Sequence, residues 1–304
     1  MSKLDQACSR ETSGNSLDLR ASTLLSYLDH MTTEFPPEVI QRGINRNWSD
    51  YRLVLKQLSI MLALCPVAPL DYLDLGAGAG VIPSVLALAG LRVTVADIWR
   101  EYAEEFKNHM GDFAEFIARF EKLHMQWVHH NILEPPLPFP AQSFDLISLF
   151  EVLEHLPQPH IVLQEVARLL RPDGLLVITV PNVANLRNRL RLLIGRSPHA
   201  DDIETWFAPG FYGHYREMTM KEVRRVLVKS DFCILTTRYS NARQWNTRLP
   251  CGRWGRNYQV NSLFQAAKLL YLAITSLIPS LRYDMFISAR KCKARAKEAR
   301  LSGI

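Results

Sequence analysis

The chain has 304 residues, of which 48% are hydrophobic and 22% are charged, so it can bury one large core and has the composition of an ordinary globular protein. No second catalytic domain is needed to account for this length. The five cysteines are scattered without a C-x-x-C pair, which argues against a zinc site or a disulfide framework and predicts reduced thiols in an intracellular protein. A formal net charge of +6 is compatible with anionic partners.

The N-terminal region divides into a polar part and a helical part. Residues 1–16 are polar, lack the apolar core of a signal peptide and are expected to be disordered. Helical periodicity begins near Leu17 and returns from Trp48 to Leu64, before Pro66 ends it. The pattern therefore predicts helices within residues 17–70.

The most informative motif is the segment Asp74 to Gly80, which has glycines at three alternate positions. It follows the apolar residues Tyr72 and Leu73 and precedes an apolar helical stretch, Val81 to Ala89. Glycines between a strand and a helix let the backbone pass close to a bound nucleoside. The motif therefore predicts a nucleoside site.

The residues after the glycines indicate which nucleoside cofactor binds. The next predicted strand, Arg92 to Ala96, ends at Asp97, about 20 residues beyond the glycines, where a carboxylate can accept hydrogen bonds from both ribose hydroxyls. A dinucleotide loop has the pattern G-x-G-x-x-G, but here Val81 replaces the third glycine and Gly80 comes one residue early. Asp74 adds a negative charge that opposes a pyrophosphate and suits a methionine amino group. S-adenosylmethionine is therefore favoured, and a nicotinamide oxidoreductase is a distant alternative.

Predicted strands and helices alternate from residue 71 onward, which indicates an α/β fold with a Rossmann-like, doubly wound sheet. Ligands of such sheets bind beyond the carboxyl ends of the strands. The predicted strands are Tyr72 to Leu75, Arg92 to Ala96, Met125 to His129, Phe144 to Leu149, Leu175 to Val180, Phe232 to Arg238 and Met285 to Arg290.

Several of these motifs together resemble the class I S-adenosylmethionine-dependent methyltransferases, over roughly Asp50 to Ser240. The segments that carry this resemblance are Asp74 to Gly80, Asp97, Phe144 to Ile147 and Leu169 to Gly174. A narrower group, which includes the ubiquinone-biosynthesis O-methyltransferases and related small-molecule and glycan methyltransferases, is similar in Glu151 to Leu156, Val180 to Asn182 and His214 to Thr219. The resemblance implies a seven-stranded sheet with an antiparallel last strand.

The residues and the resemblance together indicate how the chain is organised. The expected parts are a disordered tail, 1–16; an N-terminal helical lid, 17–70; an S-adenosylmethionine-binding core, 71–240; an apolar and basic insertion, 241–284; and a last strand with a basic tail, 285–304. In such folds the leading helices lie across the cofactor mouth, although the same helices can instead only cover the sheet edge.

The cofactor is expected to contact residues near the carboxyl ends of the first four strands. By resemblance, Asn131 receives the adenine amino group through its side-chain oxygen, where relatives commonly have Asp, and Ile132 packs on the ring. Glu151, or the backbone beside it, lines the methionine end. The expected cofactor-binding residues are Asp74, Gly76, Gly78, Gly80, Asp97, Ile98, Asn131, Ile132 and Glu151.

Histidines are the candidates for catalysis. His155 lies beside Glu154 after the fourth strand, and an imidazole can accept a hydroxyl proton near neutral pH, although this histidine can also simply cap a turn. His214 lies in a segment that folds over the acceptor in the resembling families, with a structural role as the alternative. No metal is expected, because the neighbours His129 and His130 point to opposite faces of a strand and cannot share an ion.

The segment around His214 matches the pattern H-x-R-x-x-T found in those families. Arg216 can pair with a carboxylate or with an anionic substrate. Thr219 is expected to be the N-cap of the next helix, with Glu222 completing a capping box. For Thr219 the structural role is therefore favoured over a functional one.

Methyl transfer is an in-line displacement, so the protein mainly aligns donor and nucleophile and excludes water. A general base helps only when the nucleophile must lose a proton, and two histidines near the expected pocket therefore favour O-methylation of a small-molecule or glycan hydroxyl. Nucleic acid is an unlikely partner, because neither the basic segment Asn185 to Arg196 nor the tail from Arg290 to Arg300 contains an RNA-binding module. A catalytically silent S-adenosylmethionine-binding partner protein is the alternative from another class.

The insertion contains an apolar segment, Ser262 to Pro279, flanked by basic residues. Its polar residues make it a poor membrane span, so an interfacial helix or a buried cap is expected. The protein is expected in the cytoplasm. An interfacial helix would in addition make it peripheral to an anionic membrane, with a lipid-linked or quinone-type acceptor as the alternative substrate. The oligomeric state is not determined by the sequence.

Overall fold

A computed structural model describes residues 20–34, 45–62, 70–98, 113–199, 213–240 and 262–292. Within these residues the chain forms one mixed sheet in the order β3-β2-β1-β4-β5-β7-β6. The strands are β1 (Asp71–Leu75), β2 (Arg92–Asp97), β3 (Gln126–His129), β4 (Phe144–Phe150), β5 (Leu170–Pro181), β6 (Phe232–Ser240) and β7 (Asp284–Lys291). Neighbours from β3 to β5 pair in parallel, whereas β7 is antiparallel to both β5 and β6. The predicted fold class, including its antiparallel last strand, is confirmed.

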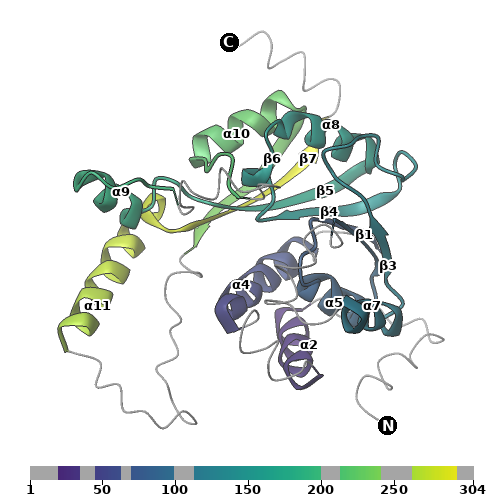
Figure 1. Ribbon diagram of the computed structural model, residues 1–304, viewed down its shortest axis with the longest axis horizontal. Coiled ribbons are helices and arrows are strands. Elements are labelled where there is room, and N and C mark those ends of the chain that lie inside the picture. The colour runs from purple at the N-terminus through teal and green to yellow at the C-terminus, as the bar shows by residue number, and fades with distance from the viewer. Residues whose placement is uncertain are drawn as a thin grey trace.

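Helices cover both faces of this sheet. The α-helices are α2 (Ala21–Glu34), α4 (Asn45–Leu62), α5 (Val81–Leu88), α7 (Phe113–Lys122), α8 (Pro159–Leu169), α9 (Leu186–Leu193), α10 (Met220–Lys229) and α11 (Ser262–Leu277), and two short 3-10 helices are η2 (Leu153–His155) and η4 (Pro279–Leu281). Figure 1 shows α2, α4, α5 and α7 on one side of the sheet and α8 and α10 on the other, while α9 and α11 lie together at one end.

The two faces of the sheet bury separate hydrophobic clusters. On the first face, side chains of α2 and α4, such as Leu28 and Leu55, pack in one cluster with Val85 of α5. On the second face, Leu163 of α8 and Leu227 of α10 pack with the alternate residues of β4 and β5. Because consecutive strand residues point to opposite faces, strands buried on both sides are largely apolar along their length.

The N-terminal helices form an outer layer on α5. Leu24, Leu28 and Met31 of α2 are buried, and so are Leu55 and Leu58 of α4. Both helices contact α5, which starts at the end of the glycine segment. These helices are therefore held against α5, the helix that follows the glycine segment. Their role as a lid remains a prediction.

Several predictions concern residues outside the described ranges. They are the disordered tail 1–16, the first part of the insertion, 241–261, and most of the basic tail, 293–304.

Strand β5 begins earlier than the sequence indicates. The pattern predicted Leu175 as its first residue, but Leu170 already pairs with Phe144 of β4, with a register shift before Leu146. Arg171, in this early part, binds Asp145 of the neighbouring strand β4 and Asp71 of β1, one strand further away. These ion pairs hold a turn-like sequence against the first residues of β1 and β4, a long-range contact that local propensity cannot show.

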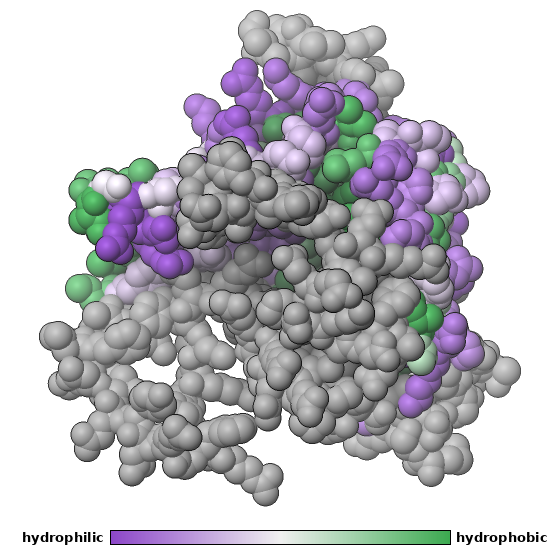
Figure 2. All heavy atoms as spheres, viewed as in Figure 1, coloured by the Kyte–Doolittle hydropathy of each residue, from purple (hydrophilic) through white to green (hydrophobic). Residues whose placement is uncertain are grey.

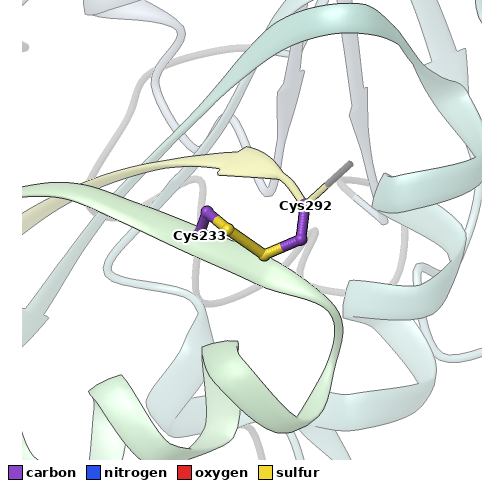
Figure 3. Close-up of a disulfide and its surroundings, with 2 residues drawn as sticks. All are labelled: Cys233 and Cys292. Atoms are coloured by element: carbon purple, nitrogen blue, oxygen red, sulfur yellow. A yellow bond between two sulfur atoms is a disulfide. The ribbon is translucent and has the colours of Figure 1, made fainter. Parts of the chain in front are cut away.

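The expectation of unpaired thiols is wrong at one pair of cysteines. Cys233 and Cys292 form a disulfide across a sequence separation of 59 residues, as Figure 3 shows. Cys233 lies in β6 opposite Arg290, and the backbone N–H of Cys292 donates to the carbonyl of Asp231. Antiparallel pairing of β6 with β7 therefore brings together two cysteines whose sequence spacing carries no motif.

Candidate active site at the carboxyl ends of the strands

The glycine segment forms a tight loop between β1 and α5. Gly76, Gly78 and Gly80 have φ angles of 74°, 51° and 62°, which lie in the left-handed region that glycine adopts most easily. The N–H of Gly76 donates to the carbonyl of Ala96 in β2 at 2.9 Å, and the N–H of Gly80 donates to the carbonyl of Ala77 at 2.8 Å. The loop therefore turns at the end of β1 and remains tied to the neighbouring strand.

Two of these glycines are also required by the protein's own packing. A Cβ atom on Gly76 would lie 2.6 Å from a methyl group of Val152, and one on Gly80 would lie 2.5 Å from the ring of Phe120. Arg119, beside Phe120, donates to the carbonyl of Ala79 in the same loop. Close approach of side chains from two other elements thus explains the glycines even before a ligand is considered.

Asp97 links the loop to the end of β2. One carboxylate oxygen accepts a hydrogen bond from the N–H of Gly78 at 2.8 Å, and the other accepts from the N–H of Ile98 at 2.7 Å. Burial raises the pKa of Asp97 to about 6, while these two hydrogen bonds act in the opposite direction. Each oxygen retains a second lone pair, so the carboxylate can still accept a ribose hydroxyl.

Asp74 is buried in β1 and has a different environment from the one the sequence indicated. Its carboxyl accepts a hydrogen bond from Ser148 of β4, whose hydroxyl also lies 2.7 Å from that of Tyr72. Burial raises the pKa of Asp74 to about 7. The predicted negative charge is therefore only partly present at neutral pH in the ligand-free protein. A cation bound beside it would lower this pKa.

The residues expected on the adenine side form a local turn. The side-chain oxygen of Asn131 accepts from the N–H of Leu133 at 3.0 Å, and its amide nitrogen donates to Glu134 at 3.1 Å. Ile132 is partly buried against the apolar cluster of the second face. Asn131 thus fixes the loop after β3, and its role toward adenine stays a prediction.

Glu151 directly follows β4 with a φ angle of 56°, an unusual conformation for a residue with a side chain. Its N–H donates to the carbonyl of Thr179 in β5 at 2.9 Å. Such strained residues are concentrated at functional sites. The strained turn leads through Val152, which contacts Gly76, directly into η2 with Glu154 and His155.

The two candidate catalytic histidines lie together. The rings of His155 and His214 have centroids 4.7 Å apart and planes at 81°. Nδ1 of His155 lies 3.0 Å from the carbonyl oxygen of Gly213. Two segments nearly 60 residues apart in sequence therefore meet at one place.

Carboxylates surround His214. Its Nδ1 lies 3.0 Å from Oε1 of Glu217, and its Nε2 lies 3.9 Å from Oε1 of Glu154. Both glutamates are buried. The N–H of Arg216 donates to the backbone carbonyl of Glu154 at 3.1 Å, so the segment that carries His214 is held against η2 by its backbone as well. We call Glu154, His155, His214 and Glu217 the acceptor cluster.

The end of this segment is a capped helix start. The hydroxyl of Thr219 accepts from the N–H of Glu222, whose carboxylate in turn accepts from the N–H of Thr219. This confirms the predicted capping box. Arg216 pairs with Glu222 at 2.6 Å, and the arginine side chain is largely exposed. Of the two partners that the sequence left open for Arg216, a carboxylate or an anionic substrate, the structure shows a carboxylate of the protein itself.

Four residues of the site were not identified from the sequence. Ser148 and Tyr72 hold Asp74, Arg119 binds the glycine loop, and Glu217 binds His214. Glu217 lies three residues after His214, a spacing that could have suggested the pair. The other three act through tertiary contacts that leave no local pattern.

Comparison with known proteins agrees with this geometry. The profile of a family described as "Methyltransferase domain" matches residues 40–237. The ubiquinone biosynthesis O-methyltransferase of Actinobacillus pleuropneumoniae serotype 5b (strain L20) is 30% identical over 123 residues, which are 40% of this chain and 50% of that enzyme. An enzyme of the same name from Vibrio vulnificus (strain YJ016) is 23% identical over 196 residues, 64% of this chain and 76% of that enzyme.

The share of each chain that these matches cover determines what they show about this protein. The chain spans about half the length of the Actinobacillus relative that it matches. A solved structure of an S-adenosylmethionine-dependent methyltransferase from Methanosarcina mazei is 23% identical, covering 76% of this chain and 97% of that chain with a TM-score of 0.49. The family profile covers well over half of this sequence, and the sheet has the strand order given above. The chain therefore belongs to the methyltransferase-domain family and has the α/β fold of class I S-adenosylmethionine-dependent methyltransferases.

Proposed function

We propose that the protein transfers a methyl group from S-adenosylmethionine to a hydroxyl oxygen of a small-molecule or glycan acceptor. The observation that carries this proposal is the position of the acceptor cluster beside the glycine loop. Val152, which contacts Gly76 of the loop, is the residue before η2, and η2 contains Glu154 and His155. Groups able to accept a proton thus lie next to the predicted site of the methyl donor.

The hydrogen bonds of the two histidines indicate which nitrogen carries the proton in each neutral ring. The carbonyl of Gly213 can only accept, so Nδ1 of His155 carries a proton and Nε2 has the lone pair in the neutral ring. The same holds for His214, whose Nδ1 faces the carboxylate of Glu217. Either Nε2 atom is therefore able to accept the proton of an acceptor hydroxyl.

The proposed reaction is a single displacement. The acceptor oxygen forms a bond to the methyl carbon while the bond from that carbon to sulfur breaks, and the hydroxyl proton passes to a histidine Nε2. Alignment of donor and acceptor supplies most of the rate enhancement. The name shared by the two curated relatives, ubiquinone biosynthesis O-methyltransferase, supports oxygen as the target.

Calorimetry with purified protein tests the donor first. S-adenosylmethionine and S-adenosylhomocysteine are expected to bind and NADH is not, and Asp97→Ala should abolish binding of the two sulfur nucleosides. A screen of hydroxylated acceptors with labelled donor then tests turnover. Binding without turnover on any acceptor would favour the catalytically silent binding protein, and preferential binding of NADH would overturn the methyltransferase.

We propose a lipid-linked or quinone-type acceptor as the second candidate, with the protein acting from the cytoplasm at a membrane surface. In the described residues, no helix is long and apolar enough to cross a membrane. Large apolar side chains are nevertheless exposed on two neighbouring helices. They are Leu190, Leu192, Leu193 and Ile194 in or just after α9, and Leu270, Leu277 and Ile278 in or just after α11.

The two helices are fixed at one end of the molecule. Asn182, just before α9, donates through its amide nitrogen to the carbonyls of Ser280 and Arg282 at 2.9 and 2.8 Å. Arg282 in turn binds the carbonyl of Thr275 near the end of α11. Figure 2 shows hydrophobic and hydrophilic side chains side by side at this end, and the exposed Arg187 adds positive charge there. Apolar and basic side chains on one surface are typical of helices that lie on anionic membranes.

Flotation with vesicles tests the second candidate. The protein should float with vesicles that contain anionic phosphatidylglycerol and bind less to neutral phosphatidylcholine. Leu192→Ser with Leu193→Ser should reduce flotation, while Leu235→Ser, an exposed leucine in β6, serves as the matched control. Equal flotation of all three proteins, or none, would argue against a membrane-bound acceptor and leave the soluble acceptor in place.

A further inference from the structure

A chain of hydroxyl and carboxyl groups lies buried between β1 and β4, next to the glycine loop. Its members Tyr72, Asp74 and Ser148 are 0%, 2% and 0% exposed. Tyr72 and Asp74 are two residues apart in β1, so their side chains point to the same face, and Ser148 lies directly opposite Asp74 in β4. Tyr72 packs in the cluster that includes α2, α4 and α5, so the chain lies on that face of the sheet.

The hydrogen bonds of this chain run toward the carboxyl. The hydroxyl of Ser148 donates its only proton to Oδ1 of Asp74. The hydroxyl of Tyr72 lies 2.7 Å from that of Ser148, so Tyr72 is the donor of this second bond. Both hydroxyl groups favour the ionised form of Asp74. The carboxyl is therefore oriented by two neutral groups.

No cation offsets the charge of this carboxyl within the described residues. Its neighbours there are the two hydroxyl groups and the carboxylate of Asp97 on β2, whose negative charge opposes ionisation. A buried carboxylate without a positive partner is unfavourable, so part of the free protein holds a proton at Asp74 instead. Asp71, at the other end of β1, differs because it pairs with Arg92 and Arg171.

The helices on this face do not supply the missing charge. The helix α5 contains no charged residue. Arg52 of α4 pairs with Asp29 of α2, and Lys56 of α4 is exposed. Arg119 of α7 directs its guanidinium to the carbonyl of Ala79 in the glycine loop. The positive charge must therefore come from a ligand.

The expected donor carries such a charge. The α-amino group of S-adenosylmethionine is mostly protonated at pH 7, because the pKa of an α-amino group is about 7.7 to 8.0. Asp74 stands two residues before Gly76, in the segment predicted to hold the donor. An ammonium group beside a carboxyl favours its ionised form.

We propose that Asp74 gives up a proton when the ammonium group of the donor binds beside it, and that Ser148 and Tyr72 are positioning residues that hold the carboxyl for this exchange. The O–H bond of the carboxylic acid breaks and the proton passes to the buffer, while the ammonium group keeps its three hydrogens. This inference rests on the proposed function, because it takes S-adenosylmethionine as the ligand.

Isothermal calorimetry measures this exchange. Titrations at about pH 7 in phosphate, HEPES and Tris give the number of protons released, from the slope of the observed enthalpy against the ionisation enthalpy of the buffer. Burial raises the pKa of Asp74 to about 7, so about half of the free protein holds the proton at this pH. S-adenosylmethionine and S-adenosylhomocysteine share the amino group, and each should release about 0.3 to 0.5 of a proton, after a small uptake by that group.

Methylthioadenosine is the matched control ligand, because it keeps the adenosine and the sulfur but lacks the amino group. It should release at most ~0.1 of a proton, which Asp97 can supply because its pKa is about 6. This comparison uses the wild-type protein and needs no variant to fold.

Variants test the two positioning residues. Asp74→Asn should reduce the release by S-adenosylmethionine to at most ~0.1 of a proton. Ser148→Ala removes a hydrogen bond that lowers the pKa of Asp74, so the release should rise toward one proton while donor affinity at pH 7 falls. Tyr72→Phe should act in the same direction by a smaller amount. A merely structural role for Ser148 would lower affinity without raising the release.

Ser288→Ala is the matched control variant. Ser288 is a buried serine of β7 whose hydroxyl lies 2.8 Å from that of Thr236, so this change also removes a hydrogen bond from the sheet. Its proton release should equal that of the wild type.

The outcomes separate this inference from the proposed function. Donor binding without proton release, or equal release by methylthioadenosine, overturns the exchange and leaves the methyltransferase in place. Equal release in the wild type and in Ser148→Ala overturns the positioning role of Ser148. No binding of S-adenosylmethionine overturns both proposals. Release that disappears in Asp74→Asn and increases in Ser148→Ala supports the exchange even if no acceptor is found.

Discussion

The cofactor edge and the acceptor cluster are built in different ways. The cofactor edge, by which we mean the glycine loop and the end of β2, comes from one short stretch that runs through β1, the loop, α5 and β2. Within it Asp97 accepts a hydrogen bond from the backbone N–H of Gly78 across 19 residues. The acceptor cluster joins His155 to a segment near His214, with a hydrogen bond that spans 58 residues. The first is therefore determined by local sequence and the second by how distant segments pack. Substitutions at the cofactor edge should therefore change donor affinity, and substitutions in the acceptor cluster should change turnover.

The largest expected effect is the pH dependence that Asp74 gives the ligand-free protein. Its pKa rises from 3.8 to about 7 because it is buried, so the folded state binds more protons than the unfolded state between about pH 4 and pH 7. The free energy of unfolding therefore falls as pH rises through this range, by at most about 4 kcal/mol. Asp97, with a pKa of about 6, acts in the same direction.

Asp74→Asn should flatten this dependence. Urea unfolding at about pH 5 and about pH 7.5 measures it, and the difference between the two pH values should shrink in the variant. Asp71→Asn is the comparison, because arginines hold the pKa of that carboxyl below its usual value and its contribution is lost as pH falls instead. An unchanged slope in Asp74→Asn would mean that this carboxyl is ionised in the folded protein.

The second effect concerns donor affinity. Asp97→Ala removes the acceptor for the N–H groups of Gly78 and Ile98 as well as the predicted ribose contact, so the Kd for S-adenosylmethionine should rise at least ~100-fold. His155→Ala should change that Kd less than ~3-fold while turnover falls. Isothermal calorimetry gives both values. Equal losses of donor affinity in the two variants would contradict the assignment of donor binding to the cofactor edge alone.

The third effect separates backbone conformation from close packing in the glycine loop. Gly76→Ala places a Cβ 2.6 Å from Val152 at a φ of 74°, so it should destabilise the protein by about 3 kcal/mol. Gly195→Ala has a similar φ of 71° but no atom within 4 Å of the new Cβ, so it should cost about 1 kcal/mol. Thermal unfolding compares the two. Equal losses of stability in the two variants would show that the loop moves to relieve the close contact between the new Cβ and Val152.

The smallest effect is at the start of α10. Thr219→Ala removes the N-cap hydroxyl and should cost about 1 kcal/mol. Arg216→Ala breaks only an exposed ion pair and should cost less than ~0.5 kcal/mol. Both are read from denaturant unfolding. A larger loss for Arg216→Ala than for Thr219→Ala would indicate that its side chain, and not the cap, holds the segment that carries His214.

Local patterns predicted much of the fold. The seven strands were placed within a few residues of their observed positions, with β5 as the exception, because its early part is held by ion pairs of Arg171 to other strands. The capping box at Thr219 was also correct, because a cap involves residues three apart. The Cys233–Cys292 bond was missed, because only the antiparallel pairing of β6 and β7 brings those residues together.

The sequence by itself determined the α/β class, the cofactor loop and the residues at the strand ends, since alternation, glycine spacing and capping are properties of neighbouring residues. Only the tertiary structure decided the environment of those residues. Burial beside Ser148 raises the pKa of Asp74, and Glu217 sets which nitrogen of His214 carries the proton. These properties depend on groups brought close through folding, because desolvation and hydrogen bonding act over a few ångströms in space, whatever the separation along the chain.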